Sequence, residues 1–183
     1  MEFGKLGCAV IHADLIAHQV LQRSDILDKL VEEFGPAVLD ADGKIDRNKA
    51  AGIAFSDPSK VAVLNRIVHP HVLEIVQRLV DYYQAHTDVP ALVLDMPLLL
   101  EVGWADRCDR LVFVACDPAT RLARAGTLTE EQVRTRENFQ ISVDKKAAIA
   151  DNTIENNSDF SALVRQTATI FSSVVKQYGG LQS

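Results

Sequence analysis

The chain has 183 residues, of which 48% are hydrophobic and 24% charged, a composition typical of a globular protein and unlike that of a fibrous or disordered chain. Its net charge of −6 argues against a nucleic-acid-binding protein, since such proteins normally present a basic surface, but it leaves room for a small anionic ligand held by a few arginines. The length suits one domain, or one domain that carries a sub-domain.

Cysteine usage and hydropathy indicate the compartment. The three cysteines are an odd number without CxxC spacing, and Cys8 and Cys116 lie in apolar runs where a free thiol packs as a small hydrophobic group. The N-terminal residues lack the pattern of a signal peptide, and no apolar run reaches membrane-spanning length. We therefore expect a cytoplasmic protein without a membrane partner.

The first strand is predicted where small and apolar residues run from Cys8 to Ile11, and a helical pattern follows Asp14 at once. In parallel α/β sheets the ligand crevice lies at the carboxyl ends of the strands. This rule places Asp14 where chemistry takes place. An alternative is that Asp14 only caps the following helix, and the spacing alone leaves both interpretations open.

A helical block is predicted from residue 24 to about residue 86. Ser24, Asp46 and Asp57-Pro58 have the residue types that begin helices, and Pro70 is expected to break or kink the helix that Asp57 opens. Such a block is too long for a simple crossover between two strands. We therefore interpret it as an inserted sub-domain.

Strands alternate with helices in the second half of the chain. Strands are predicted at residues 91–97, 111–116 and 152–156, and helix starts at Asp117-Pro118 and at Thr129, with a closing helix from Phe160 to Gly179-Gly180. This alternation predicts an α/β fold with a parallel sheet and right-handed crossovers.

Basic residues gather between residues 118 and 146. They are Arg121, Arg124, Arg134, Arg136, Lys145 and Lys146. Guanidinium groups bind phosphate through forked hydrogen bonds, so one interpretation is a mobile flap over a phosphorylated ligand. The other is a solvated helical face stabilised by ion pairs between residues four positions apart.

The histidines give weak signals. His69-Pro70-His71 suits a metal site poorly, because positions on either side of a proline splay the two rings and no further ligand follows at the usual spacing. A polar-ligand contact or a structural helix break is the more economical interpretation. His12, His18 and His86 receive no role.

A phosphate-binding loop of the form GxxxxGK[ST] does not occur in the sequence. Gly4-Lys5 is followed by Leu6 and lacks the upstream glycine. Gly43-Lys44 is followed by Ile45, with Val38 in the position of the first glycine.

A series of motifs nevertheless resembles the dephospho-coenzyme A kinase family. The motifs are, in chain order, Val10-Ile11-His12-Ala13-Asp14, Ile16-Ala17-His18, Asp42-Gly43-Lys44-Ile45-Asp46-Arg47, Phe55-Ser56-Asp57-Pro58, Leu64-Asn65-Arg66-Ile67-Val68-His69-Pro70, Leu94-Asp95-Met96-Pro97-Leu98-Leu99-Leu100-Glu101, Ala150-Asp151 and Ile154-Glu155-Asn156-Asn157. The resemblance covers essentially the whole chain. It implies a P-loop kinase fold with a core at 1–23 and 89–183, a helical acceptor-binding sub-domain at 24–88 and an arginine-bearing lid near 118–146.

The function implied by this resemblance is transfer of the γ-phosphoryl group of ATP to the 3′-hydroxyl of dephospho-CoA, the last step of coenzyme A synthesis, with Mg²⁺ bound to the nucleotide. The expected partners are these two small molecules, without nucleic acid, and the oligomeric state stays open. One alternative is a protein that binds dephospho-CoA or a related nucleotide without turnover. Another is a different small nucleotide kinase, against which the helical insertion and the GKIDR and VHP strings speak.

The resemblance also implies roles for individual residues. Asp14 matches the catalytic carboxylate that orients the attacking hydroxyl and accepts its proton, and Arg124 matches a lid arginine that neutralises charge on the phosphoryl group. The implied substrate-binding residues are Arg47, His69, Pro70, Asp95 and Pro97, and the residues implied near the adenine of ATP are Asn156 and Asn157.

The sequence departs from the family pattern in three ways. The family begins with a strand, a glycine-rich loop and a helix, whereas this sequence begins inside that helix, so we expect about 20 residues and the kinase activity to be missing. The missing strand would separate the strands predicted at 91–97 and 111–116 and would leave their edges unpaired. His12 stands where the family usually has a second Asp, and the lid is a few residues short around Ala125-Gly126-Thr127.

Overall fold

The computed structural model describes residues 2–85, 88–126, 129–157 and 159–178. His86, Thr127 and the predicted helix end at Gly179-Gly180 lie outside these residues.

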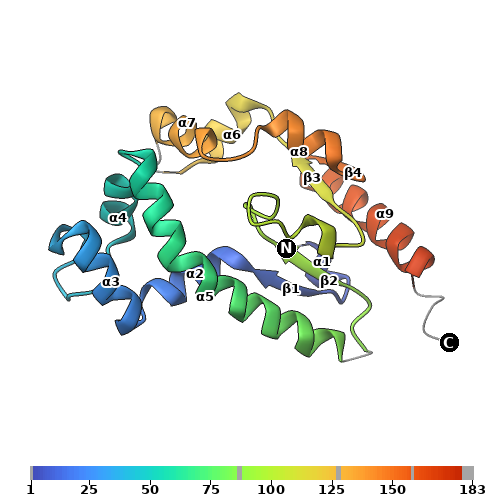
Figure 1. Cartoon of the computed structure of the whole chain (residues 1–183). Helices are drawn as coiled ribbons and strands as arrows, with labels where there is room; N and C mark the ends of the chain where they lie inside the picture. The colour runs from blue at the N-terminus through green and yellow to red at the C-terminus, as the bar shows by residue number, and fades with distance from the viewer. Residues whose placement is uncertain (1, 86–87, 127–128, 158, 179–183) are drawn as a thin grey trace. The chain divides into compact units, whose positions relative to one another are not determined.

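Short strands alternate with helices along the described chain, which confirms the predicted α/β class (Figure 1). The order is α1 Glu2–Lys5, β1 Ala9–His12, α2 Ala13–Leu21, α3 Ser24–Phe34, the 3₁₀ helix Pro36–Val38, α4 Arg47–Ala54, α5 Pro58–Gln84, β2 Leu92–Asp95, the 3₁₀ helix Ala105–Arg107, β3 Val112–Ala115, α6 Pro118–Arg124, α7 Glu130–Asn138, α8 Val143–Ile149, β4 Asn152–Glu155 and α9 Phe160–Tyr178.

The described strands form two two-stranded sheets, β1 with β2 and β3 with β4. Ala9 N–H donates to the carbonyl of Ala91 at 3.1 Å, and His12 contacts Asp95 at the other end, so β1 and β2 run in the same direction. β3 and β4 are parallel, with Phe113 opposite Thr153. Within the described residues β2 and β3 do not pair with each other, so each has a strand partner on one side.

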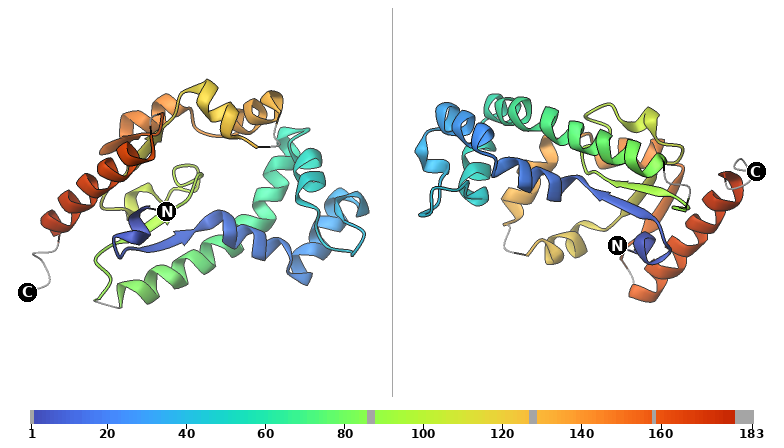
Figure 2. Two further views of the ribbon diagram at one scale, coloured as in Figure 1. Left: turned by 180° about the vertical axis from the view of Figure 1, so that it is seen from behind. Right: turned by 90° about the horizontal axis from the view of Figure 1, so that it is seen from below.

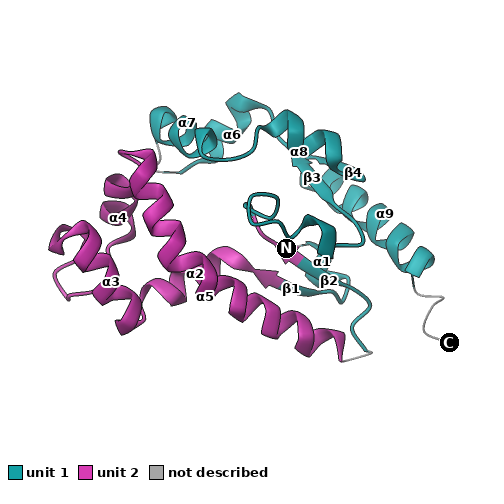
Figure 3. Cartoon of the chain, in the orientation of Figure 1, with its two compact units in different colours: residues 1–10, 87–93, 97–183 teal, residues 11–86, 94–96 magenta. Residues whose placement is uncertain are grey.

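The chain divides into two compact units, which Figure 3 shows in different colours. Unit 2 consists of residues 11–86 and 94–96, and unit 1 of residues 1–10, 87–93 and 97–183. The domain boundaries expected at residues 24 and 88 stay a prediction.

The core of unit 2 lies between its helices. α5 lies beside α2, and α3 packs on both (Figure 2). Besides Ala13, the buried apolar residues of these three helices are Ile16, Val20, Ile26, Leu30, Val61, Val68, Val72 and Val76. Burial of side chains of this size contributes about 1.5–3 kcal/mol each, which makes this stripe the main source of stability in the unit.

The core of unit 1 includes α9, which packs against β4 and against the short α1 (Figure 2). Ile154 of β4 and Ile170 of α9 are buried, and Trp104 is buried after β2. Thr167 is buried as well, and its hydroxyl donates to the carbonyl of Leu163 at 2.9 Å, so the polar group is satisfied within the helix.

Local capping rules fix most helix starts. Asp46 accepts hydrogen bonds from the N–H groups of Asn48 and Lys49, and Asp57 and Asp117 cap helices that begin with a proline. Thr129 forms the predicted capping box. The predicted cap at Ser24 is wrong by one residue.

The chain in front of Ser24 explains that shift. Arg23 occupies the N-cap position in an extended conformation, and its guanidinium binds Asp25 at 2.9 and 3.0 Å. Ser24 is therefore the first helical residue of α3.

Of the break or kink expected at Pro70, the break does not occur, because α5 runs as one helix from Pro58 to Gln84, and Figure 1 shows the ribbon of α5 changing direction along its length. A proline in a helix interior costs about 3 kcal/mol, since it lacks the N–H that would bond to the preceding turn. Val68 and Val72 are buried on either side of Pro70, while Pro70 itself is exposed. Packing of the buried stripe offsets the lost hydrogen bond.

Of the described helices, none is both long enough and apolar enough to cross a membrane.

Candidate functional site

The carboxyl ends of β1 and β2 carry a His–Asp pair. His12 is the last residue of β1 and Asp95 the last residue of β2, and the Nδ1 of His12 lies 2.8 Å from Oδ2 of Asp95. Both side chains remain partly exposed, at 36% and 44%. The pair therefore joins two strand ends and still faces solvent.

Asp14 lies in the first turn of α2, next to this pair in the chain. The N-cap position belongs to His12, and no side chain caps the helix, so the interpretation of Asp14 as a cap is wrong. Its exposed carboxylate makes no hydrogen bond or ion pair within the described part of the chain. The carboxylate is therefore accessible to a ligand.

Electrostatic coupling connects Asp14 with His18 and Arg47, all of unit 2. Burial lowers the pKa of His18 from its ordinary value, the positive charge of Arg47 lowers it further, and Asp14 acts in the opposite direction. His18 follows Asp14 by one helical turn, and Arg47 is the first residue of α4. Arg47 is exposed and forms no ion pair with any residue that the structure describes.

Sequence reasoning gave His18 no role. The position of His18 four residues after Asp14 could have indicated the coupling between them, because this spacing places both side chains on one face of a helix.

His69 and Pro70 lie in the middle of α5, which packs beside α2. Burial lowers the pKa of His69, so its ring is neutral at pH 7. The structure places His69, Pro70 and Asp95 in the same unit as Asp14 and Arg47. Among the described residues no hydrogen bond or ion pair joins His69 to Asp14, and the two are related through the packing of α5 beside α2.

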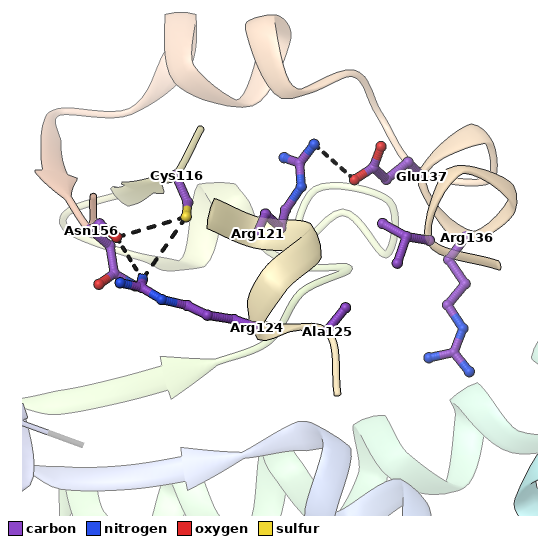
Figure 4. Close-up of a pocket in the computed structure, with 8 residues that line it drawn as sticks. Cys116, Arg121, Arg124, Ala125, Arg136, Glu137 and Asn156 are labelled. Carbon is purple, nitrogen blue, oxygen red and sulfur yellow. Dashed lines mark hydrogen bonds and ion pairs between the residues drawn. The ribbon is translucent and has the colours of Figure 1, made fainter. Parts of the chain in front are cut away.

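In unit 1, a cavity of about 400 Å³ lies between α6, α7 and the residues after β3 and β4 (Figure 4). It is lined by Cys116, Arg121, Arg124, Ala125, Val133, Arg136, Glu137 and Asn156. Three arginines around one cavity attract an anionic ligand.

The arginines of this cavity already have partners. Arg124 Nη1 donates to the backbone carbonyl of Asn156 at 2.6 Å, and the same nitrogen lies 4.0 Å from Sγ of Cys116. Arg121 forms an ion pair with Glu137 at 3.0 Å, and Figure 4 shows Arg136 extending from α7 away from that pair. An anion must therefore compete with existing contacts.

Asn157, predicted near the adenine together with Asn156, is not one of the residues that line the cavity. Its Oδ1 accepts a hydrogen bond from the N–H of Asp117 at 2.7 Å, which holds the start of α6 against the end of β4. Asn157 shapes the cavity through this bond.

The backbone of Pro97 takes part in a partly buried cluster that sequence reasoning missed. Lys146 Nζ lies 3.0 Å from Glu101 Oε1 and donates to the Pro97 carbonyl and to Gln140 Oε1, both at 2.9 Å. The N–H of Ile141 donates to Glu101 Oε1 at 2.8 Å. Lys146 is thus an anchor for the basic segment, and neither a phosphate ligand nor part of a solvated face.

The residues that the structure describes contain no group of three or more His, Cys, Asp or Glu side chains that could hold a metal ion. Mg²⁺ bound to a nucleotide does not require such a group, because it keeps several waters and is held mainly by phosphate oxygens.

Comparison with known proteins connects these features to one family. The family model described as Dephospho-CoA kinase matches residues 1–162. The dephospho-CoA kinase of Symbiobacterium thermophilum is 36% identical over 179 residues, which cover 95% of this chain and 74% of that protein. The dephospho-CoA kinase of Streptomyces avermitilis is 38% identical over 174 residues, covering 92% and 83%.

Solved structures show the same likeness. The crystal structure of TT1252 from Thermus thermophilus superposes with a TM-score of 0.72 at 26% identity and covers 94% of this chain and 87% of its own. The dephospho-CoA kinase from Campylobacter jejuni has a TM-score of 0.64 at 21% identity, covering 95% and 88%, a likeness in fold.

Proposed function

The chain belongs to the dephospho-CoA kinase family, and we propose that Asp14 is the catalytic carboxylate of its ATP-dependent phosphorylation of dephospho-CoA. In this role Asp14 orients the 3′-hydroxyl of the acceptor and accepts its proton as the γ-phosphoryl group is transferred. Phosphoryl transfer depends mainly on positioning and on charge stabilisation, so a carboxylate within hydrogen-bond reach is sufficient.

The single observation that carries this role is the state of the Asp14 side chain. It stands exposed in the first turn of α2, beside the ends of β1 and β2, and is not used for capping or for an ion pair with the described residues. A carboxylate without a structural partner at a strand end is available to a substrate.

We propose unit 2 as the acceptor side. Dephospho-CoA carries a diphosphate, and Arg47 offers an exposed guanidinium that is electrostatically coupled to the Asp14–His18 face of α2. His69, Pro70 and Asp95 complete the proposed acceptor set within unit 2, and a substrate-binding role of Pro97, which belongs to unit 1, stays a prediction. For the domains, we propose a helical acceptor-binding sub-domain at 24–88 and a core at 1–23 and 89–183.

We propose the arginine-lined cavity as the nucleotide side. ATP displaces the Asn156 carbonyl from Arg124, which then neutralises charge on the phosphates, while Asn156 and Asn157 lie near the adenine. Residues 118–146 form the lid. Mg²⁺ accompanies ATP and supplies charge neutralisation at its phosphates.

Two further proposals concern turnover and location. No GxxxxGK[ST] loop occurs in the 183 residues, so ATP meets no backbone cradle of that type within them and low turnover of this chain is expected. A cytoplasmic location is proposed because all three cysteines are free thiols.

The test is a radiometric assay of the 183-residue chain with γ-labelled ATP and dephospho-CoA, together with calorimetric titration of dephospho-CoA. Labelled coenzyme A above the enzyme-free background supports the kinase. Saturable binding of dephospho-CoA without any labelled product favours the non-catalytic binder, and absence of binding contradicts both.

A further inference from the structure

The pair formed by His12 and Asp95 has a geometry that suits proton transfer. An ionised carboxylate can only accept hydrogen bonds, so the 2.8 Å contact between Asp95 Oδ2 and His12 Nδ1 requires the hydrogen to be on Nδ1. In the neutral ring the lone pair is then on Nε2. Asp95 thus fixes both the orientation of the ring and the nitrogen that can act as a base.

Nε2 is the open end of this pair. It makes no hydrogen bond with any residue in the described ranges, and 36% of the side chain is exposed. His12 ends β1 and Asp14 follows in the first turn of α2, so two proton acceptors stand at one strand end, in one unit.

We propose that His12 is a second catalytic residue of the phosphoryl transfer, whose Nε2 takes up the proton of the acceptor hydroxyl. The proposal rests on the proposed function of unit 2 as the acceptor side. Asp14 orients the hydroxyl and passes its proton on to His12, and Asp95 holds the imidazole ring.

The O–H bond of the acceptor hydroxyl breaks, and its proton moves to the Asp14 carboxylate and from there to Nε2 of His12, directly or through one water. The freed oxygen forms a bond to the γ-phosphorus of ATP, and the bond between that phosphorus and the bridging oxygen breaks, with the electron pair leaving on ADP. The resulting imidazolium is stabilised by the carboxylate of Asp95.

A free imidazole is a stronger base than a free carboxylate, which makes a histidine a suitable final acceptor for this proton. The competing explanation is that His12 only ties β1 to β2. These two roles use different nitrogens of the ring, which allows them to be separated by substitution.

His12→Asn separates the roles. Its amide N–H can still donate to Asp95, as Nδ1 does, but no base remains in the place of Nε2. We expect kcat to fall about 100-fold while KM for dephospho-CoA changes less than about twofold. Added imidazole is expected to restore part of the rate in His12→Ala, which leaves space for the ring. Unchanged kcat in His12→Asn would show that the residue is only a structural tie.

A measurement without turnover decides the matter even if the chain is slow. In ¹⁵N-histidine NMR, with His12 assigned by its absence in His12→Asn, the neutral ring is expected to carry its hydrogen on Nδ1. Saturating dephospho-CoA is expected to shift Nε2, whereas coenzyme A, whose 3′ position carries a phosphate, is not expected to reproduce that shift.

Three outcomes are distinguishable. A shift of Nε2 with dephospho-CoA supports the proposal. A hydrogen on Nε2, or an unmoved Nε2 when calorimetry shows that dephospho-CoA is bound, overturns it and leaves the function of unit 2 intact. Failure of dephospho-CoA to bind at all removes the proposed function and this inference with it.

Discussion

The acceptor side in unit 2 and the arginine-lined cavity in unit 1 hold their charges differently. Asp14 and Arg47 make no ion pair with the described residues, whereas Arg121 and Arg124 of the cavity are bound to Glu137 and to the Asn156 carbonyl. A ligand of the first region finds charged groups ready, and a ligand of the second has to exchange partners. This difference predicts opposite effects on ligand affinity. Removing a charged group of the first region weakens binding, whereas removing the partner of an arginine in the second region strengthens it.

The free-energy cost of breaking an ion pair of unit 1 is small for Arg121–Glu137 and large for Lys146–Glu101. Arg121 and Glu137 are each 36% exposed, and an exposed ion pair contributes about 0–1 kcal/mol. Lys146 and Glu101 are only 17% and 16% exposed and have several further bonds. Unit 1 therefore contains one ion pair that a ligand can displace, Arg121–Glu137, and one that it cannot, Lys146–Glu101.

The largest stability effect is expected at this anchor. Lys146→Met leaves the largely buried Glu101 carboxylate without its cation, which costs about 3 kcal/mol of the free energy of unfolding. The measurement is urea denaturation, with Lys145→Met as the matched control because its side chain is exposed on the same helix. Equal midpoints for the two variants would mean that the cluster is not an anchor.

On the acceptor side, Arg47→Ala is expected to raise the Kd of dephospho-CoA about tenfold, because a charge-assisted hydrogen bond to a phosphate contributes about 1.5–3 kcal/mol. Calorimetry provides the measurement. Arg78→Ala, which removes an exposed arginine from α5 of the same unit, should bind as the parent chain does. If Arg78→Ala weakens binding as much as Arg47→Ala does, the effect is one of net charge.

On the nucleotide side, a substitution is expected to strengthen ligand binding instead of weakening it. Glu137→Gln frees Arg121 from its ion pair, so ATP is expected to bind up to about fivefold more tightly. Fluorescence titration with a labelled nucleotide measures this change, and Glu130→Gln on the same helix is the control. Weaker binding in Glu137→Gln would indicate that Glu137 itself helps to hold the nucleotide.

The smallest effect concerns pH. Burial lowers the pKa of His69, so below the ordinary histidine pKa the unfolded state binds a proton that the folded state does not. Stability is therefore lost as pH falls below about 6.5 and is fully present above it. His69→Gln should show a smaller decrease in Tm between pH 8 and pH 5.5 than the parent chain. An identical decrease in both would assign the pH dependence to other groups, such as His18.

Local features of the fold could be predicted from the sequence, and long-range ones could not. The caps at Asp46, Asp57 and Thr129 were predictable because a cap involves residues two or three positions apart. The pair of His12 and Asp95 joins residues 83 positions apart, and no pattern in either strand indicates it. Pro70 shows the same limit, since the valines that hold α5 together act through packing.

The site shows a similar division. The strand-end rule placed Asp14, and family likeness placed Arg124 and Asn156, which the structure brings into contact. Lys146 was grouped with the arginines because charge runs reveal composition, not burial. Glu101, which holds it, carried no signal of its own outside the family motif.

The most direct test of the central claim compares Asp14→Asn with Asp28→Asn, an identical chemical change on an exposed residue of α3. Label transfer from ATP to dephospho-CoA and the Kd of dephospho-CoA are measured for both. We predict that Asp14→Asn lowers the rate about 1,000-fold with Kd changed less than about threefold, because the carboxylate acts on the transferred proton more than on binding. Transfer at the parent rate in Asp14→Asn would contradict the catalytic role of Asp14.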